Sequence, residues 1–185
     1  MLEGKNVNLR IMEREDLPLY VKWVNDPNFF GEHNPLEQTT KTEVEKNYDN
    51  APPEKRKFFI EKKDGTKIGV VNTFPVRSFL EIGFTLIPSE RGKGYGLEAV
   101  VILVDYLFLA RDLVRVQATT DLKNVASQRV LEKAGFTREG VVRKAGFVRG
   151  QWKDEYLYSI LREEWKEPKI LTRLEKWDKT LPSPL

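Results

Sequence analysis

The chain has 185 residues, of which 40% are hydrophobic and 32% are charged, a composition typical of a soluble globular protein. The formal net charge of +3 is too small for the basic surface of a nucleic-acid-binding protein, and no apolar run is long enough to cross a bilayer. With no cysteine and one histidine, the chain has no disulfide framework and few ligands for zinc or iron. We therefore expect one domain over residues 1–185, with no metal, nucleic acid or membrane as partner. We expect it in the cytoplasm, because the N-terminus has no apolar signal segment.

The first quarter of the chain combines a strand, a helix and a loop. Alternating apolar residues over 7–11 predict a strand, and apolar residues at helical spacing over 17–24 predict a helix. We expect a loop over residues 29–35. A second helix is predicted to begin at Thr40, because Thr40 and Glu43 have the spacing of a capping box, in which each side chain bonds to the other residue's backbone N–H.

A β-hairpin is predicted next, from an Asp-Gly turn at residues 64–65. Strands are expected on its two sides, over residues 58–62 and 67–74. The basic residues at 55–57, just before the first of these strands, are interpreted as a solvated strand end. Another apolar run, over residues 80–87, predicts a further strand.

The second half of the chain begins with a helix predicted over 97–110, whose apolar residues occupy a wide face. A strand over 114–118 follows. The next helix is predicted to begin after Asn124, a good N-cap residue, and to end at Gly135, because glycine favours the position just after a helix. A last hairpin is expected over residues 138–161.

This order of elements predicts a mixed α/β fold. Hairpins lie on both sides of a central strand–helix–strand–helix unit, which favours one mixed sheet covered by helices on both faces. Residues 163–185 form a C-terminal tail in which apolar residues recur at helical spacing, and we expect a helix that docks on the same domain.

The most informative segment is a glycine-rich turn between the strand over 80–87 and the helix over 97–110. It has the sequence Arg91-Gly92-Lys93-Gly94-Tyr95-Gly96. Three glycines allow backbone N–H groups to surround an oxygen-rich group without Cβ atoms in the way. The helix behind the turn adds unpaired N–H groups and the positive end of its dipole. Such a turn is suited to bind an anion, and a pyrophosphate fits it best.

Spacing separates three kinds of pyrophosphate site. A Walker A loop needs Ser or Thr after Gly-Lys, but Gly94 follows here. A dinucleotide fingerprint starting at Gly92 would need glycine where the chain has Leu97. The remaining pattern, Arg91-x-x-Gly94-x-Gly96, resembles the acyl-CoA signature of the GNAT superfamily of N-acetyltransferases. Residues 124–136 resemble the family's second block, which begins with Asn and ends in Glu-Lys-x-Gly-Phe.

The resemblance implies a GNAT acyl-CoA N-acyltransferase fold, whose mixed, mostly antiparallel sheet has about seven strands flanked by helices. It also implies acetyl-CoA as co-substrate. The pantetheine arm would lie along Thr85, Leu86 and Ile87. The pyrophosphate would bind the amides of Gly92, Lys93, Gly94, Tyr95 and Gly96, with charge from Arg91 or Lys93. Asn124 would bind pantetheine, cap its helix, or do both.

For catalysis, the resemblance points to a general base and a proton donor. Many family members place a carboxylate where this chain has Glu81, on the strand before the glycine-rich turn. Many carry Tyr seven residues after the Asn of the second block, where this chain has Leu131, which cannot donate a proton. Ser127 is the nearest replacement, while Tyr156 and Tyr158 are alternatives.

The acceptor is less defined. The stretch from 139 to 154 resembles the RimJ/RimL-like subgroup, whose members acetylate protein N-terminal amines, while relatives acetylate small amines. We expect direct attack of a primary amine in a ternary complex, by a monomer or homodimer. Phe29, Phe30, His33 and Trp152 are candidates to line the acceptor pocket. A non-catalytic acyl-CoA-binding module and a nucleotide-binding protein remain alternatives.

Overall fold

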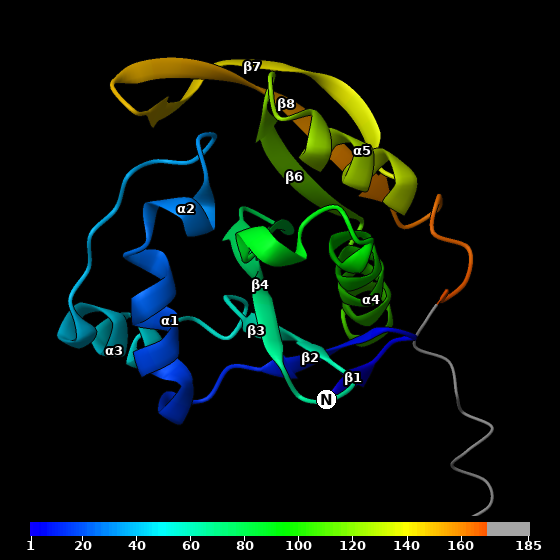
Figure 1. Ribbon diagram of the computed structural model, residues 1–185. Coiled ribbons are helices and arrows are strands. Elements are labelled where there is room, and N and C mark those ends of the chain that lie inside the picture. Colours follow the sequence, from blue (N-terminus) through cyan, green and yellow to red (C-terminus); the bar gives the residue numbers. More distant parts are fainter. Residues whose placement is uncertain (170–185) are drawn as a thin grey trace, which may run out of the picture.

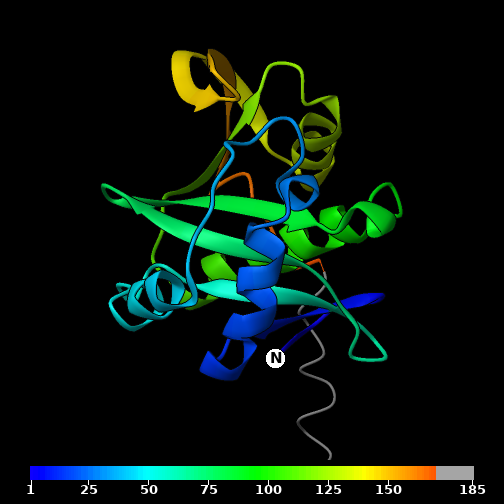
Figure 2. The ribbon, with the colours of Figure 1, turned by 60° about the vertical axis from the view of Figure 1, so that its left-hand side comes forward.

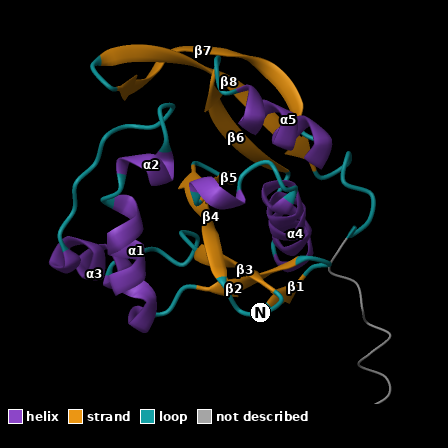
Figure 3. Ribbon diagram, viewed as in Figure 1, coloured by secondary structure: helices purple, strands orange, loops and turns teal. Residues whose placement is uncertain are grey.

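The computed structural model describes residues 1–169 of the chain and contains one sheet of eight strands in the order β1-β2-β3-β4-β5-β6-β8-β7. The strands are β1 (Leu2–Glu3), β2 (Val7–Ile11), β3 (Lys57–Lys62), β4 (Lys67–Val76), β5 (Phe79–Leu86), β6 (Arg115–Asp121), β7 (Thr137–Val148) and β8 (Gln151–Leu161). Neighbouring strands are antiparallel except β5 and β6, which are parallel (Figure 3). The mixed, mostly antiparallel sheet is thus confirmed, with the short β1 among its eight strands.

Helices cover both faces of the sheet. They are η1 (Arg14–Asp16), α1 (Leu17–Val24), α2 (Pro27–Phe30), α3 (Lys41–Asp49), η2 (Pro88–Glu90), α4 (Tyr95–Ala110) and α5 (Val125–Ala134). Helices α1, α2 and α3 lie on one side of the sheet, and α4 and α5 lie on the other (Figures 1 and 2). None of the helices in the described part of the chain has the length and apolarity to span a bilayer.

Two predicted helix boundaries are confirmed, and one predicted loop is partly wrong. The Thr40 hydroxyl accepts from the Glu43 N–H at 3.2 Å while the Glu43 carboxylate accepts from the Thr40 N–H at 2.7 Å, so the capping box exists. Gly135 ends α5 with a φ of 99°, a left-handed value that glycine adopts without a Cβ clash. The start of the loop expected over 29–35 is instead helical in α2, where the Asp26 carboxylate accepts from the N–H of Asn28.

Two apolar clusters hold these layers together. The larger lies between the sheet and helices α4 and α5, and α4 is buried over most of its circumference, as its long apolar run predicts. The smaller lies on the other face, where Phe29 of α2 and Leu17 of α1 pack with Phe59 of β3. Residues of β3 therefore alternate between the two clusters, with Phe58 facing α4 and Phe59 facing α1.

The start of α1 is fixed to the sheet by an ionic cluster around Asp16. The Asp16 carboxylate lies 2.8 Å from the Arg10 guanidinium and 2.9 Å from the Lys67 ammonium, while Arg10 also binds Glu61 at 2.8 Å. Burial by itself raises the pKa of Asp16, but hydrogen bonds from Arg10, the Glu13 backbone and Lys67 outweigh it and lower that pKa to about 2. The cluster therefore favours the charged carboxylate in the folded chain.

We expect this cluster to make stability depend on acid pH. Because the folded pKa of Asp16 lies below its ordinary value of 3.8, the carboxylate stabilises the fold above pH 4, and this contribution is lost as the pH falls toward 2. Asp16→Asn is expected to lower the free energy of unfolding by about 2 kcal/mol at pH 7. Urea unfolding of both proteins at pH 7 and pH 2.5 should show the difference shrinking at the lower pH. A difference that stays constant would contradict this assignment.

The first residues of the C-terminal tail dock on α4. The indole N–H of Trp165 donates to the Asp105 carboxylate at 2.8 Å, and the backbone N–H of Lys169 donates to the same carboxylate at 2.9 Å. The Trp165 ring lies 5.5 Å from that of Phe108. The helix predicted further along the tail, from Ile170 onward, lies outside the described residues.

Candidate functional site

The site lies where the two parallel strands separate. Strands β5 and β6 pair at Leu80–Val116 and Glu81–Gln117. Beyond these positions β5 continues beside β4 as far as Leu86, while β6 continues beside β8, so the two strands diverge (Figure 1). The backbone groups on the facing edges of the two strands are therefore available to a ligand, since a sheet edge presents unpaired N–H and C=O groups.

A cleft of about 740 Å³ opens at this divergence. Its volume is in the range of small-molecule and cofactor sites. It is lined by Phe30, Gly31, Glu32, His33 and Asn34 after α2, by Phe84, Thr85 and Leu86 of β5, by Arg91, Gly92, Gly94, Gly96 and Leu97, and by Lys123, Asn124, Val125, Ala126, Ser127, Arg129, Val130 and Lys133. Thus the glycine-rich turn, the end of β5 and the start of α5 converge, as the sequence predicts.

The glycine-rich turn presents bare backbone to this cleft. Gly92 and Gly94 have φ values of 75° and 89°, which L side chains rarely adopt. A Cβ built on either residue would meet no atom within 4 Å, so the space beside them is open. Gly94 is also the N-cap of the 16-residue helix α4, whose first backbone N–H groups and positive dipole end favour an anion here.

Basic side chains surround the same opening. Arg91, Lys123, Arg129 and Lys133 line the cleft, and Glu32 is the one carboxylate among the described lining residues. Sequence analysis missed the last three of these basic residues. The spacing of four between Arg129 and Lys133 places both on one face of α5, which is the signal that could have found them. The cleft is suited to a polyanion.

The Arg91 side chain forms part of the wall of the cleft. Its guanidinium donates to three backbone carbonyls, those of Leu86 at 3.0 Å, Asn28 at 2.8 Å and Phe29 at 2.6 Å. Burial lowers the pKa of Arg91. These bonds fix α2 against the end of β5 and hold one side of the cleft in place.

Three residues predicted to bind the cofactor do not line the cleft. Lys93 forms an ion pair with Glu90 at 3.2 Å, and Tyr95 packs against the core beside α4. Ile87 packs with the apolar cluster on the α1 side of the sheet. The pleat of β5 explains why Ile87 faces away from the cleft, because successive residues at the end of a strand point to opposite faces.

Asn124 and Ser127 stand together at the start of α5. The Asn124 side-chain oxygen accepts from the Ser127 N–H at 3.1 Å, which confirms Asn124 as the N-cap. The Ser127 hydroxyl has no hydrogen-bond partner among residues 1–169 and lines the cleft. Leu131, one helical turn further, is 1% exposed in the core. Ser127 is therefore the hydroxyl of α5 that lines the cleft.

The two tyrosines of β8 lie outside the cleft. Tyr158 is fully buried, and its hydroxyl donates to the Glu132 carboxylate at 3.0 Å. Burial, helped by this hydrogen bond, raises the pKa of Tyr158 to about 12. Tyr156 packs beside it, with ring centroids 6.4 Å apart. Neither hydroxyl lines the cleft.

Glu81 occupies the last paired position before β5 and β6 diverge. Its carboxylate accepts from the Gln117 amide at 2.8 Å and from the Thr119 hydroxyl at 3.2 Å, both on β6. Because Leu80 and Ile82 face α4, the side chain of Glu81 projects from the opposite face, toward α1 and α2. A carboxylate thus stands at the apex of the divergence, on the face away from α4.

The four residues predicted to line an acceptor pocket divide into two pairs. Phe30 and His33 line the cleft. Phe29 is 1% exposed and stacks on Trp23 at 5.1 Å, so it belongs to the core between α1 and the sheet. Trp152 is 61% exposed and packs on Phe147 in the last hairpin, away from the lining residues.

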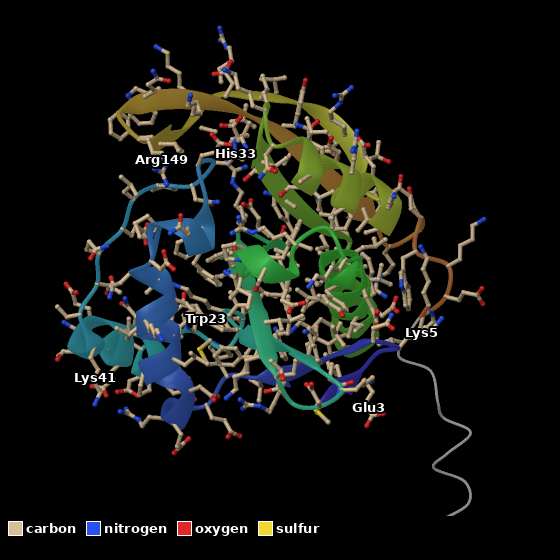
Figure 4. All side chains as sticks on the ribbon, viewed as in Figure 1. Glu3, Lys5, Trp23, His33, Lys41 and Arg149 are labelled. Atoms are coloured by element: carbon tan, nitrogen blue, oxygen red, sulfur yellow. The ribbon has the colours of Figure 1, made fainter. Side chains whose placement is uncertain are left out.

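The loop after α2 is held over the cleft by contacts that sequence analysis missed. His33 lies at this loop (Figure 4), with its Nδ1 atom 3.7 Å from the Asp121 carboxylate at the end of β6. Arg149, in the turn between β7 and β8, donates to the carbonyl of Gly31 at 3.2 Å. The loop therefore lies at the open end of the divergence and forms one wall of the cleft.

Two proteins that are similar in sequence to this chain are N-acetyltransferases by name. The N-acetyltransferase YnaD of Bacillus subtilis, itself uncharacterised, is 41% identical over 85 residues, which are 46% of this chain and 50% of YnaD. This chain thus spans about half the length of that relative. The spermidine N(1)-acetyltransferase of Escherichia coli K12 is 25% identical over 171 residues, which cover 89% of this chain and 91% of that protein.

A solved structure and a protein-family model that match this chain are also acetyltransferases, both of the GNAT family. The crystal structure of a GNAT-family acetyltransferase from Bacillus anthracis superposes with a TM-score of 0.75 and 27% identity, covering 88% of this chain and 98% of that one. The model of the acetyltransferase (GNAT) domain matches residues 6–137, which contain both the glycine-rich turn and the start of α5. The chain therefore belongs to the GNAT acetyltransferase family.

Proposed function

We propose that the protein transfers an acetyl group from acetyl-CoA to a primary amine. The observation that carries this proposal is the convergence of a bare-backbone turn, a helix N-terminus and four basic side chains on the divergence of β5 and β6. These are the elements that a long ligand with an anionic end and a polar arm requires.

The lining residues fit the parts of coenzyme A in order. The diphosphate would bind the backbone N–H groups of residues 92–96, with positive charge from Lys123, Arg129 and Lys133. The pantetheine arm would follow the free edge of β5 at Thr85 and Leu86. The Asn124 side chain, whose oxygen is used for capping, would offer its amide N–H₂ to this arm.

Direct transfer to the amine needs a base at the apex and a proton donor near the sulfur. The amine nitrogen forms a bond to the acetyl carbon while the carbon–sulfur bond breaks. Glu81, directly or through a water, takes the proton that the amine loses. Ser127 donates a hydrogen bond to the leaving thiolate, and solvent supplies its proton. No cysteine is present for a covalent intermediate.

Ser127→Ala tests the donor role. We expect kcat to fall about tenfold, while the KM for acetyl-CoA changes little, because the hydrogen bond matters only as charge develops on sulfur. Ser127→Thr keeps a hydroxyl on the same helix and should retain more of the activity. Steady-state assays of thiol release measure both variants. An alanine variant with unchanged kcat would remove Ser127 from the mechanism.

The acceptor proposed is a protein N-terminal amine, as in the RimJ/RimL-like subgroup, or a small-molecule amine. The presence of Ser127 near the start of the second block, with Leu131 at the position where many members have Tyr, supports that subgroup, because its members use Ser in that neighbourhood. A thiol-release assay with acetyl-CoA and a mixed panel of peptides and amines tests the proposal. Release above the background without acceptor is expected. Tight CoA binding with no release from any amine would contradict catalysis and favour a binding module.

A further inference from the structure

A second cavity lies on the α1 side of the sheet. It has a volume of about 470 Å³ and lies between α1, α3 and the strands β2 and β3. Apolar side chains such as Met12, Leu17 and Val44 form much of its lining. Phe30 lines both this cavity and the cleft, so the two spaces meet at one aromatic ring.

A half-buried cation, Lys57, faces this apolar cavity, whose lining also includes Lys55 and Arg56. The Lys57 ammonium donates to the Tyr20 hydroxyl at 2.7 Å and lies 4.1 Å from the centre of the Tyr20 ring. No carboxylate of residues 1–169 forms an ion pair with Lys57; the exposed Glu37 lines the same cavity and acts on Lys57 from further away. Burial lowers the pKa of Lys57 to about 8 and raises that of Tyr20 to about 12. The charged ammonium would therefore gain from an anion in the cavity.

The strand register connects Lys57 with the apex of the divergence. Lys57 of β3 pairs with Asn72 of β4, and Asn72 pairs with Gly83 of β5, so the three form a row across the sheet. All three project from the face opposite α4, because Phe58, Val71 and Ile82 face α4. Two strand spacings separate Lys57 from Gly83, which is about 10 Å between their Cα atoms.

The row ends at Gly83, where the side chains of Asn72 and Phe74 occupy the space that a Cβ would take. Gly83 follows Glu81 by two residues on the same face, next to the proposed site of acetyl transfer. A Cβ at Gly83 would come within 3.0 Å of the Asn72 side-chain oxygen, so Asn72 already leans over this position. The surface between Lys57 and Glu81 therefore offers an anion-binding end and an amine-binding end, with the Asn72 amide and the exposed Phe74 ring between them.

We propose that the acceptor is an amphoteric molecule, with an apolar body, a primary amine near Glu81 and a carboxylate that pairs with Lys57. The inference rests on the proposed acetyltransferase function and specifies its substrate class. Glu81 lies two residues along β5 from this row, so the Cα atoms of Lys57 and Glu81 are about 12 Å apart. A carboxylate and an amine separated by about 10 Å suit the two side chains, because both project from the same face. A diamine of the same length would place a second cation against Lys57 and is disfavoured.

Calorimetry with CoA-saturated protein directly tests whether the acceptor site prefers an amine that also carries a carboxylate. The probes are 8-aminooctanoate, octylamine and 1,8-diaminooctane, which share a chain length and differ in the group at one end. We expect 8-aminooctanoate to bind at least about tenfold more tightly than octylamine, the effect of one charge-assisted hydrogen bond, and the diamine to bind more weakly still. Similar affinities for all three would overturn the inference, and this comparison needs no variant.

Lys57→Met removes the charge with little change in volume, and Lys22→Met is the matched control on the exposed side of α1. We expect the first variant to lose the preference for 8-aminooctanoate and the second to keep it. A Lys57→Met protein with the wild-type preference would overturn the inference.

A thiol-release assay distinguishes failure of the inference about the acceptor from failure of the proposed acetyl transfer. Release with octylamine but not with 8-aminooctanoate overturns the inference, whereas Lys57-dependent binding without release from any amine overturns acetyl transfer alone.

Discussion

Gly94→Val is expected to weaken CoA binding by at least about tenfold, because its methyl groups would occupy the space where the diphosphate meets the backbone. The backbone also contributes, since a β-branched residue is strained at a φ of 89°. Calorimetric titration with CoA measures the loss.

A matched control separates the two effects. Gly65, in the turn between β3 and β4, has a φ of 83° and also has no atom within 4 Å of a built Cβ. Gly65→Val should therefore carry a similar backbone strain, seen as a similar fall in thermal stability, and bind CoA as the wild type does. Equal CoA affinity in the Gly94 and Gly65 variants would contradict the placement of the diphosphate.

Glu81→Gln is expected to lower kcat about a hundredfold near neutral pH while leaving the affinity for CoA unchanged. The amide keeps the shape of the carboxylate but cannot take a proton. Because the glutamine amide cannot accept a proton, the profile of kcat against pH should differ between the variant and the wild type.

Glu139→Gln is the control for this pH profile. Glu139 also accepts a hydroxyl hydrogen bond, from Ser159 at 2.6 Å, and pairs with Arg115 at 2.9 Å. Like Glu81 it is not among the residues that line the cleft, but it lies on β7, separated from Glu81 on β5 by β6 and β8. Its variant should keep the wild-type profile of kcat against pH. A Glu81→Gln enzyme with an unaltered profile would remove Glu81 as the base and direct attention to His33, beside Asp121.

Local signals account for the parts of the fold that sequence predicts well. The capping box at Thr40 and the terminal glycine of α5 are decided by neighbouring residues, so they can be identified without the tertiary structure. Helix α2 was missed because its four residues are too short for a periodic pattern. The glycine-rich turn was recognised for the same reason as the caps, because its glycines are close neighbours in the sequence.

The missed parts of the site depend on contacts between distant segments. His33 and Asp121 are 88 positions apart, and no local pattern joins them. Arg129 and Lys133 have the appearance of a solvated helix face until the cleft is known. Lys57 was interpreted as part of a solvated strand end, and this was partly wrong: it begins β3, but Tyr20 of α1 half-buries it. Burial of a charge is a property of packing and not of the local sequence.

The most direct measurement is a crystal structure of the protein with bound CoA. The account predicts diphosphate oxygens within hydrogen-bond distance of the backbone N–H groups of residues 92–96, with pantetheine in the gap between β5 and β6. Coenzyme A bound at any other surface, or absent at saturating concentration, would contradict the central claim.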